Sequence, residues 1–302
     1  MTFGGWSIFC IVILTVLILD LFVFHRKAHV ICFKEALLGS LAWIALAMLF
    51  NLYIYFAMGK LAAVNFFTGY LVEKSLSVDN IFVFLMIFHY FKTPATSLHK
   101  VLFWGIFGAI VSRAIFILLG LAVIEKFHPI IYLFGIFLII TGFKLAFMKG
   151  KEIHPERNFV IKLIHRFFPV TKEYEDDRFF VKRNTKLFMT PLFLVLIAIE
   201  TTDLVFAVDS IPAILAITLD PFIVFTSNIF AILGLRSLFF LVAGSLSLFH
   251  YLHYGIALIL VFVGFKMLIS DVWKISSFLT LGITGAILAV SILASIWKAK
   301  KT

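Results

Sequence analysis

Apolar runs about as long as a lipid bilayer is thick dominate this sequence. A transmembrane helix needs about 20 consecutive apolar residues. Nine runs of this kind occur in the chain, at residues 6–24, 37–59, 67–90, 101–124, 129–148, 188–217, 222–246, 253–270 and 278–297. Only 14% of the 302 residues are charged and 63% are hydrophobic, whereas soluble domains carry about 25% charged residues. We therefore expect an all-α, polytopic membrane protein of about nine transmembrane helices, forming a single transmembrane domain over residues 1–302.

The distribution of Lys and Arg between the loops indicates how the chain crosses the membrane. If the N-terminus is outside, the inside segments carry 18 Lys or Arg residues and the outside loops carry three. Because basic residues accumulate on the cytoplasmic side, this bias predicts an external N-terminus and a cytoplasmic C-terminus. Residues 149–187 then form a cytoplasmic loop, which we expect to be a mobile connector. The net charge of +10 has the same origin, so we expect no nucleic-acid partner.

Two acidic stretches lie inside apolar runs and share one frame. Each begins with an acid, which is followed by five residues of which the last is Val. An Asp comes next, and then a residue with an amide or hydroxyl side chain. The first copy contains Glu73, Asp79 and Asn80, and the second contains Asp203, Asp209 and Ser210. Carboxylates at bilayer depth are costly and persist mainly where they face a cavity and have a function. Two copies in one chain therefore suggest a single site that is built from two halves.

The similarity between the two halves extends beyond the acids. Two further pairs of segments match in the same order: Phe107–Arg113 with Phe230–Arg236, and Gly142-Phe143-Lys144 with Gly264-Phe265-Lys266. We therefore predict that spans three to five, residues 67–148, are repeated as spans six to eight, residues 188–270. A repeat of three spans places the second copy upside down in the membrane. Inverted repeats with a site at their midplane interface are typical of secondary transporters.

The chemistry of the acidic stretches favours a hard cation. The predicted metal ligands are Glu73, Asp79, Asn80, Glu200, Asp203, Asp209 and Ser210. Oxygen ligands of this kind suit Mg²⁺, Ca²⁺ or Mn²⁺ better than Zn²⁺ or Cu⁺. The alternative is structural charge pairing, because Arg113 and Arg236 lie within spans. We expect both, with the arginines neutralising some of the carboxylates and a surplus of acid remaining, and we interpret Lys74 as a pairing residue and not as a ligand.

The spacing of the acids raises a geometric question. Glu73 and Asp79 would lie about 9 Å apart along the axis of a straight helix, so they cannot both bind one ion without distortion. Either they form two layers of a path, or the helix is unwound between them. In the second copy, Pro212 cannot donate to the carbonyl of Val208. We therefore expect the run 188–217 to bend there and to free a backbone oxygen beside Asp209.

The sequence contains none of the enzyme motifs that would suit a membrane protein of this kind. It contains no H-E-x-x-H, no Gly-x-Gly-Asp and no P-loop, so a membrane protease or an ATP-driven pump within this chain is not expected. Cys10 and Cys32 form no disulfide that the pattern supports. We expect no bound cofactor besides a transported divalent cation.

The acidic motifs resemble those of the TerC family, which is named for tellurium resistance. The resemblance rests on Glu73-x5-Asp79-Asn80 and on Glu200-x2-Asp203-x5-Asp209-Ser210-x-Pro212-Ala213, and it covers about residues 65–270. The family comprises bacterial and plant membrane proteins of the LysE-type transporter superfamily, and its Alx-type members are linked to manganese export. The resemblance thus implies Mn²⁺ efflux across a bacterial inner membrane. The oxygen ligands permit Mn²⁺ without selecting it.

Two functions of different classes follow from these observations. The first is a secondary exporter of divalent cations, with Mn²⁺ as the expected substrate and protons carried by the same carboxylates. The second is a non-transporting membrane partner of a secretion or stress-response complex, in which the acids are buried structural pairs. Besides the lipid bilayer and the metal ion, the sequence leaves open a homo-oligomer or a secretion-complex partner.

Overall fold

The computed structural model describes the backbone of most of the chain. The described residues are 3–19, 33–127, 129–147, 168–171, 173–183, 186–244, 251–270, 272–273 and 275–299. Within the helices, the side chains outside the description are those of Phe3, residues 17–19, Asp79, Asp209 and Ala299. Cys32 also lies outside the described residues.

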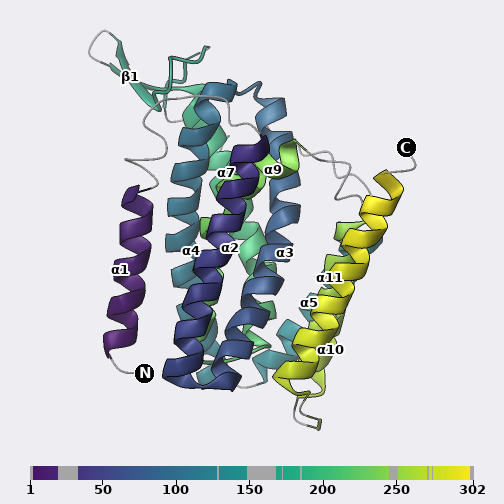
Figure 1. Ribbon diagram of the computed structural model, residues 1–302. Coiled ribbons are helices and arrows are strands. Elements are labelled where there is room, and N and C mark those ends of the chain that lie inside the picture. The colour runs from purple at the N-terminus through teal and green to yellow at the C-terminus, as the bar shows by residue number, and fades with distance from the viewer. Residues whose placement is uncertain are drawn as a thin grey trace.

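The described residues form a bundle of helices that run along one common direction, with a small hairpin at one end (Figure 1). In chain order the helices are α1 (Phe3–Leu19), α2 (Phe33–Met58), α3 (Lys60–Tyr90), the short η2 (Ala95–Ser97), α4 (Leu98–Lys126), α5 (Ile130–Phe147), α7 (Pro191–Leu215), α8 (Pro221–Leu233), α9 (Leu235–Ala243), α10 (Leu252–Leu268) and α11 (Ser277–Ala299). The strands are β1 (Phe180–Arg183) and β2 (Lys186–Met189). In Figure 1, α1 lies at one edge of the bundle, and α5, α10 and α11 lie together at the opposite edge.

Each predicted span overlaps with a described helix, or with the pair α8 and α9 for residues 222–246. By length and apolar composition, five of the described helices can cross a membrane, and the pair α8 and α9 makes a sixth if it is counted as one span. Helices α1 and α10 are shorter apolar helices. Helix α3 is 31 residues long but carries four charged residues, Lys60, Glu73, Lys74 and Asp79. The protein is therefore an α-helical membrane protein with several spans, whereas the total of nine spans stays a prediction.

Local sequence explains where two of the central helices begin. Pro191 and Pro221 occupy the first turns of α7 and α8, where proline is favoured because its missing N–H would have no partner inside the helix. Asp220 caps α8, since its Oδ1 accepts hydrogen bonds from the backbone N–H of Phe222 at 2.9 Å and of Ile223 at 3.3 Å. A carboxylate in this position satisfies backbone donors that the first turn leaves unpaired.

Helices of one predicted repeat pack against helices of the other. Helix α3 contacts α8, α7 contacts α4, and α5 contacts α10. Helices α3 and α7, which carry the two acidic motifs, also contact each other. This arrangement encloses the polar faces of α3, α4, α7 and α8 between apolar neighbours.

Glycines allow the closest of these contacts, between α5 and α10. A side chain at Gly264 would place its Cβ 2.6 Å from the backbone oxygen of Gly135, and one at Gly142 would place it 2.7 Å from the oxygen of Ala257. Residue numbers thus rise along one helix as they fall along the other, so the two helices are antiparallel. Small residues, glycine above all, permit two helix backbones to approach this closely.

Aromatic side chains fill the apolar core on the side of α2. The rings of Phe50 and Phe230 lie 4.7 Å apart, and those of Phe50 and Phe66 lie 5.8 Å apart. Phe9 brings α1 into the same cluster, with its ring 6.1 Å from that of Phe230. Tilted and edge-on pairs at these separations are the favoured arrangements of aromatic rings. These phenylalanines therefore pack α1, α2, α3 and α8 against one another.

The backbone of α3 excludes one of the two alternatives for its acids. Helix α3 is continuous from Lys60 to Tyr90, so it is not unwound between its two acids. Helix α7 continues through Pro212 and ends at Leu215, so the proline does not end the helix. Because Pro212 has no N–H to donate to the carbonyl of Val208, the bend and the free backbone oxygen beside Asp209 stay predictions. Among the described helices, a break that the sequence analysis did not predict lies between α8 and α9, where the axis bends by 41° at Gly234.

The loop between the predicted repeats contains structure that the sequence analysis missed. Strands β1 and β2 pair as an antiparallel hairpin, with Phe180 opposite Met189. The segment before the hairpin is tied to the ends of α3 and α4. Ser97 Oγ donates to Asp177 Oδ1 at 2.5 Å, and the Tyr174 hydroxyl donates to the carbonyl of Phe91 at 2.8 Å. The described part of this loop is therefore anchored to the ends of α3 and α4, and a mobile cytoplasmic connector over residues 149–187 stays a prediction.

Candidate functional site

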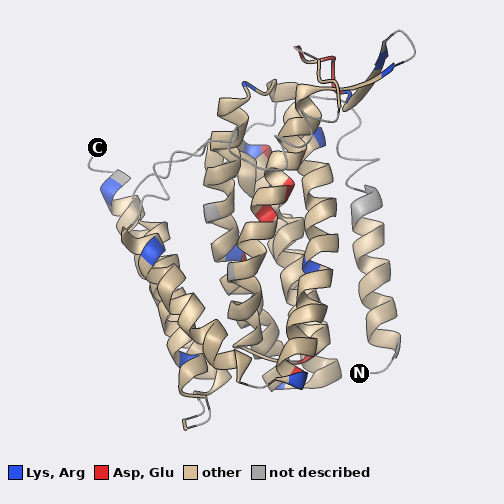
Figure 2. Ribbon diagram, turned by 180° about the vertical axis from the view of Figure 1, so that it is seen from behind, with Lys and Arg blue, Asp and Glu red and all other residues tan. Residues whose placement is uncertain are grey.

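Five polar residues from four helices meet inside the bundle and form a buried charge cluster. Its members are Glu73 on α3, Arg113 on α4, Asp203 and Ser210 on α7, and Asn228 on α8. The exposed fraction of each residue is 3% or less. Figure 2 shows acidic and basic positions in the middle of the bundle, far from both of its ends. The surrounding helices are apolar, so this cluster lies in a medium of low dielectric constant.

Arg113 is the centre of the cluster. Its Nη1 forms an ion pair with Glu73 Oε1, and its Nη2 lies 3.3 Å from Asp203 Oδ1. The same Nη1 also donates to Ser210 Oγ at 3.1 Å and to Asn228 Oδ1 at 3.4 Å. Asn228 in turn donates from Nδ2 to Glu73 Oε2 at 3.0 Å. Buried ions need such pairing and hydrogen bonding because bare charges are costly in an apolar interior.

The cluster holds two carboxylates and one guanidinium, so its acids outnumber its bases. Asp203 Oδ2 and Arg113 Nε are buried and have no hydrogen-bond partner among the described residues. Beside Asp203 lies a small cavity of about 10 Å³, with apolar walls from α3, α4, α7 and α9. This volume is at the lower limit for holding one water molecule. One carboxylate oxygen of the cluster is therefore left available for an additional small partner.

Glu200 lies close to the cluster but outside its hydrogen bonds. It is one turn before Asp203 on α7, and its carboxylate packs directly against Gly108 on α4. A side chain at position 108 would overlap with both of its carboxylate oxygens. The glycine thus makes room for an acid between two helices. Another predicted ligand, Asn80, is buried on α3 with an exposed fraction of 3%.

The other predicted site residues are only partly placed. Asp79 and Asp209 lie within α3 and α7, but their side chains are outside the described residues. Among the described residues, no group of three or more His, Cys, Asp or Glu side chains could hold a metal ion. Arg236 is buried on α9, with an exposed fraction of 5%. A metal-binding role for the acids and a charge-pairing role for Arg236 stay predictions.

The sequence analysis missed one member of the charge cluster, Asn228. Asn228 belongs to the run Thr226-Ser227-Asn228, three polar residues within an apolar span, which was a usable signal. Thr226 and Ser227 bond back to carbonyls four residues earlier, at 2.6 Å each. The Asn228 side chain, which is longer than that of serine or threonine, reaches across to Glu73 Oε2 instead. Its amide links α8 to the acidic motif of α3.

Lys74 has a different partner from its neighbour Glu73. Its Nζ donates to the carbonyl of Ala231 at 3.2 Å, close to the bend between α8 and α9. The last carbonyls of a helix lack partners within the helix, and a cation there is favourable. A Cβ at Gly234 would come within 2.6 Å of this Nζ and 3.1 Å of Trp43 Cβ. The glycine at the break therefore leaves space for the lysine.

The fold and the cluster define a class of protein: an integral membrane protein with several helical spans and a charge cluster enclosed between four of them. The Integral membrane protein TerC family model matches residues 58–302. No solved structure matches this chain. The match covers most of the chain, and we conclude that the protein belongs to the TerC family.

Curated relatives agree with this assignment over nearly their whole lengths. The chain is 49% identical to "Uncharacterized membrane protein STKORF319" of Myxococcus xanthus, covering 98% of this chain and 93% of the relative. It is 46% identical to an uncharacterized membrane protein of Rickettsia bellii, with 97% of each chain covered. It is 44% identical to "Putative membrane-bound redox modulator Alx" of Escherichia coli, covering 97% and 94%. The resemblance to Alx-type proteins is thereby confirmed.

Proposed function

We propose that this protein is a secondary exporter of divalent metal cations, with Mn²⁺ as the substrate, and that it is not an enzyme. The observation that carries the proposal is the buried charge cluster, in which Asp203 Oδ2 has no partner beside a cavity of about 10 Å³. A membrane interior rarely keeps an uncompensated carboxylate oxygen unless an ion or a proton occupies it at some stage. Carboxylate, amide and hydroxyl oxygens are the ligands that Mn²⁺ prefers.

The role of Arg113 in this proposal is to hold two acids in place. It pairs with Glu73 and Asp203 and reduces their mutual repulsion. Arg113 neutralises one of these two acids, so one negative charge of the cluster remains. Three further acids, Glu200, Asp79 and Asp209, lie within two helical turns of Glu73 or Asp203 along α3 and α7 and add to this charge. The same acids would take up protons when the metal leaves, and this exchange would couple export to the proton gradient.

An inverted repeat is part of the proposal, and the packing between helices supports it. If Gly142 corresponds to Gly264, then Gly135 corresponds to Ala257. The contact of Gly135 with Gly264 is then the symmetry mate of the contact of Gly142 with Ala257. The contacts of α3 with α8 and of α7 with α4 form an equivalent pair in the same way. Such symmetry allows two halves of a transporter to exchange conformations around a central site.

The proposed location is the inner membrane of a bacterium, with the N-terminus outside and the C-terminus in the cytoplasm. The first residues of α1 and the last residues of α11 lie at opposite ends of the bundle (Figure 1). The hairpin β1–β2 lies at the end where α11 finishes. That end carries the excess of Lys and Arg, so the positive-inside rule supports it as the cytoplasmic side.

The alternative is a non-transporting membrane partner of a secretion or stress-response complex. It is favoured by the pairing of both Glu73 and Asp203 with Arg113, since such pairs also occur as purely structural features. In that case the protein would co-purify with other proteins, and its loss would leave the metal content of cells unchanged.

The test is Mn²⁺ transport by the purified full chain in lipid vesicles with an imposed proton gradient. Asp203→Asn removes the charge that faces the cavity but keeps an acceptor for Arg113, so transport should fall at least tenfold while the protein remains folded. Asp79→Asn and Asp209→Asn should do the same, and the double change should be no worse than either alone. Glu125→Gln, an exposed acid at the end of α4, is the control. Full transport by Asp203→Asn would overturn the proposal.

A further inference from the structure

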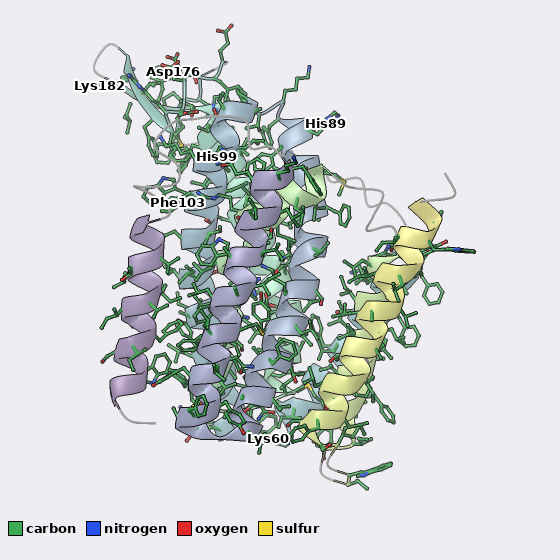
Figure 3. The ribbon with its side chains drawn as sticks, viewed as in Figure 1. Lys60, His89, His99, Phe103, Asp176 and Lys182 are labelled. Carbon is green, nitrogen blue, oxygen red and sulfur yellow. The ribbon has the colours of Figure 1, made fainter. Side chains whose placement is uncertain are left out.

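A second cavity lies at the opposite end of the bundle from the hairpin. It has a volume of about 520 Å³ and lies where α7 and α10 end and where α5 and α11 begin. The nearby Lys60 marks this end in Figure 3, far from Asp176 and Lys182. Lys60 Nζ lies 5.0 Å from the centre of the Phe278 ring, next to the cavity residue Ser277. A cavity of this size is within the range that holds small organic ligands, about 300–1,000 Å³.

The lining of this cavity is amphipathic and positively charged. Among the described residues that line it, Lys266 is the charged side chain, and no acid is present. Hydroxyl groups come from Thr218, Ser270 and Ser277, and the remaining walls are apolar residues of the ends of α5, α7 and α10 and the segment before α11. One cation, several hydroxyls and an apolar wall match a ligand with an anionic head and a hydrocarbon tail.

Among the described residues, Lys266 has no counter-ion. No hydrogen bond or ion pair joins its ammonium to another described residue, although the side chain is half-buried. A partly buried charge in a membrane protein is unfavourable until it is paired. Its counterpart in the proposed repeat, Lys144 in Gly142-Phe143-Lys144, is exposed on α5 and lines no described cavity. The two lysines therefore share a sequence motif but differ in their surroundings.

We propose that this cavity binds one anionic phospholipid from the surrounding membrane. The phosphate of the headgroup accepts from Lys266 and from the neighbouring hydroxyls, and the first part of an acyl chain lies along the apolar wall. The position at the end of the bundle places the site at the depth of the lipid headgroups. The bound lipid would join the end of α7, which carries the second acidic motif, to α10 and α11. This inference does not depend on metal export.

The test uses the purified full chain in a neutral detergent and measures two quantities. Native mass spectrometry counts the phospholipids that stay bound, and tryptophan fluorescence gives the midpoint of thermal unfolding. Phosphatidylglycerol should remain bound as a single molecule and raise the midpoint, whereas phosphatidylcholine at the same concentration should do neither. Lys266→Met should lower the affinity for phosphatidylglycerol about fivefold, the effect of one lysine at an anionic lipid surface. Lys144→Met, the matched control, should leave it unchanged.

Several results would overturn the proposal. These are equal retention of the two lipids by the wild-type protein, an unchanged affinity in Lys266→Met, or an equal loss in Lys144→Met. An equal rise of the midpoint with inorganic phosphate would show a site for a free anion and not for a lipid. Because the wild-type comparison needs no variant, the test still decides if Lys266→Met does not fold. Lys266→Arg, which keeps the charge, should retain the lipid.

Discussion

Two interfaces between the proposed repeats use opposite means to hold helices together inside a membrane. At the first, α3, α4, α7 and α8 meet through the buried charge cluster around Arg113. At the second, α5 and α10 meet through glycines that bring one backbone against the other. The first interface depends on side chains of opposite charge, and the second depends on the absence of side chains.

The difference has a physical reason in the solvent. Lipid tails are as apolar as leucine, so the hydrophobic effect does not drive helices together within the bilayer. Close van der Waals contact and polar pairing are the available alternatives. Close contact gives a rigid interface, whereas a polar interface can respond to protons and ions. We therefore expect substitutions at α5 and α10 to affect stability alone, and substitutions in the charge cluster to affect both stability and transport.

The largest loss of stability is expected for Arg113→Ala. It leaves Glu73 and Asp203 buried and unpaired, and breaking a buried ion pair in this way costs about 3–5 kcal/mol. The measurement is the amount of folded protein in membranes, followed by thermal unfolding in detergent. Arg113→Lys keeps the charge but not the forked geometry, so it should fall between wild type and Arg113→Ala. Normal abundance and transport in Arg113→Ala would contradict the central role of the arginine.

A smaller loss is expected for Gly264→Ala at the glycine interface. The added Cβ would lie 2.6 Å from the backbone oxygen of Gly135, so two helices must separate, at a cost of about 1–3 kcal/mol. Transport per folded molecule should be unchanged, and this distinguishes the two interfaces. Gly282→Ala on α11 is the control, because no other atom lies within 4 Å of the new Cβ. Equal unfolding midpoints for the two variants would show that α5 and α10 can separate without cost.

The smallest effect is expected for Ser210→Ala in the charge cluster. It removes the hydroxyl that accepts from Arg113 at 3.1 Å. A hydrogen bond to a charged group contributes about 1.5–3 kcal/mol, and we expect the lower end because the same Nη1 also bonds to Glu73 and Asn228. Transport should decrease by less than in Asp203→Asn, because a neutral hydroxyl is a weaker ligand than a carboxylate. Ser75→Ala is the matched control: Ser75 Oγ donates to the carbonyl of Leu71 at 2.6 Å, within its own helix. Indistinguishable transport rates in the two serine variants would exclude Ser210 from the site.

The sequence by itself determined the helical membrane class and the positions of the helices, because long apolar runs have few alternatives in a bilayer. It also singled out Glu73, Asp203 and Arg113, since charged residues in such runs are rare and costly. It did not determine that α3 stays helical past its acids, or that the break falls at Gly234. Serines and a late proline weaken a helix only slightly, and packing against neighbours outweighs so small a preference.

Only the tertiary structure decided which charged residues meet. Arg113 joins Glu73, which is 40 residues earlier in the chain, to Asp203, which is 90 residues later. Lys74 turns instead towards Ala231, although it adjoins Glu73 in sequence. Neighbours on a helix point about 100° apart, so adjacent residues serve different interfaces. The rotation and depth of each helix set these partners, and both are properties of the packed bundle and not of any single segment.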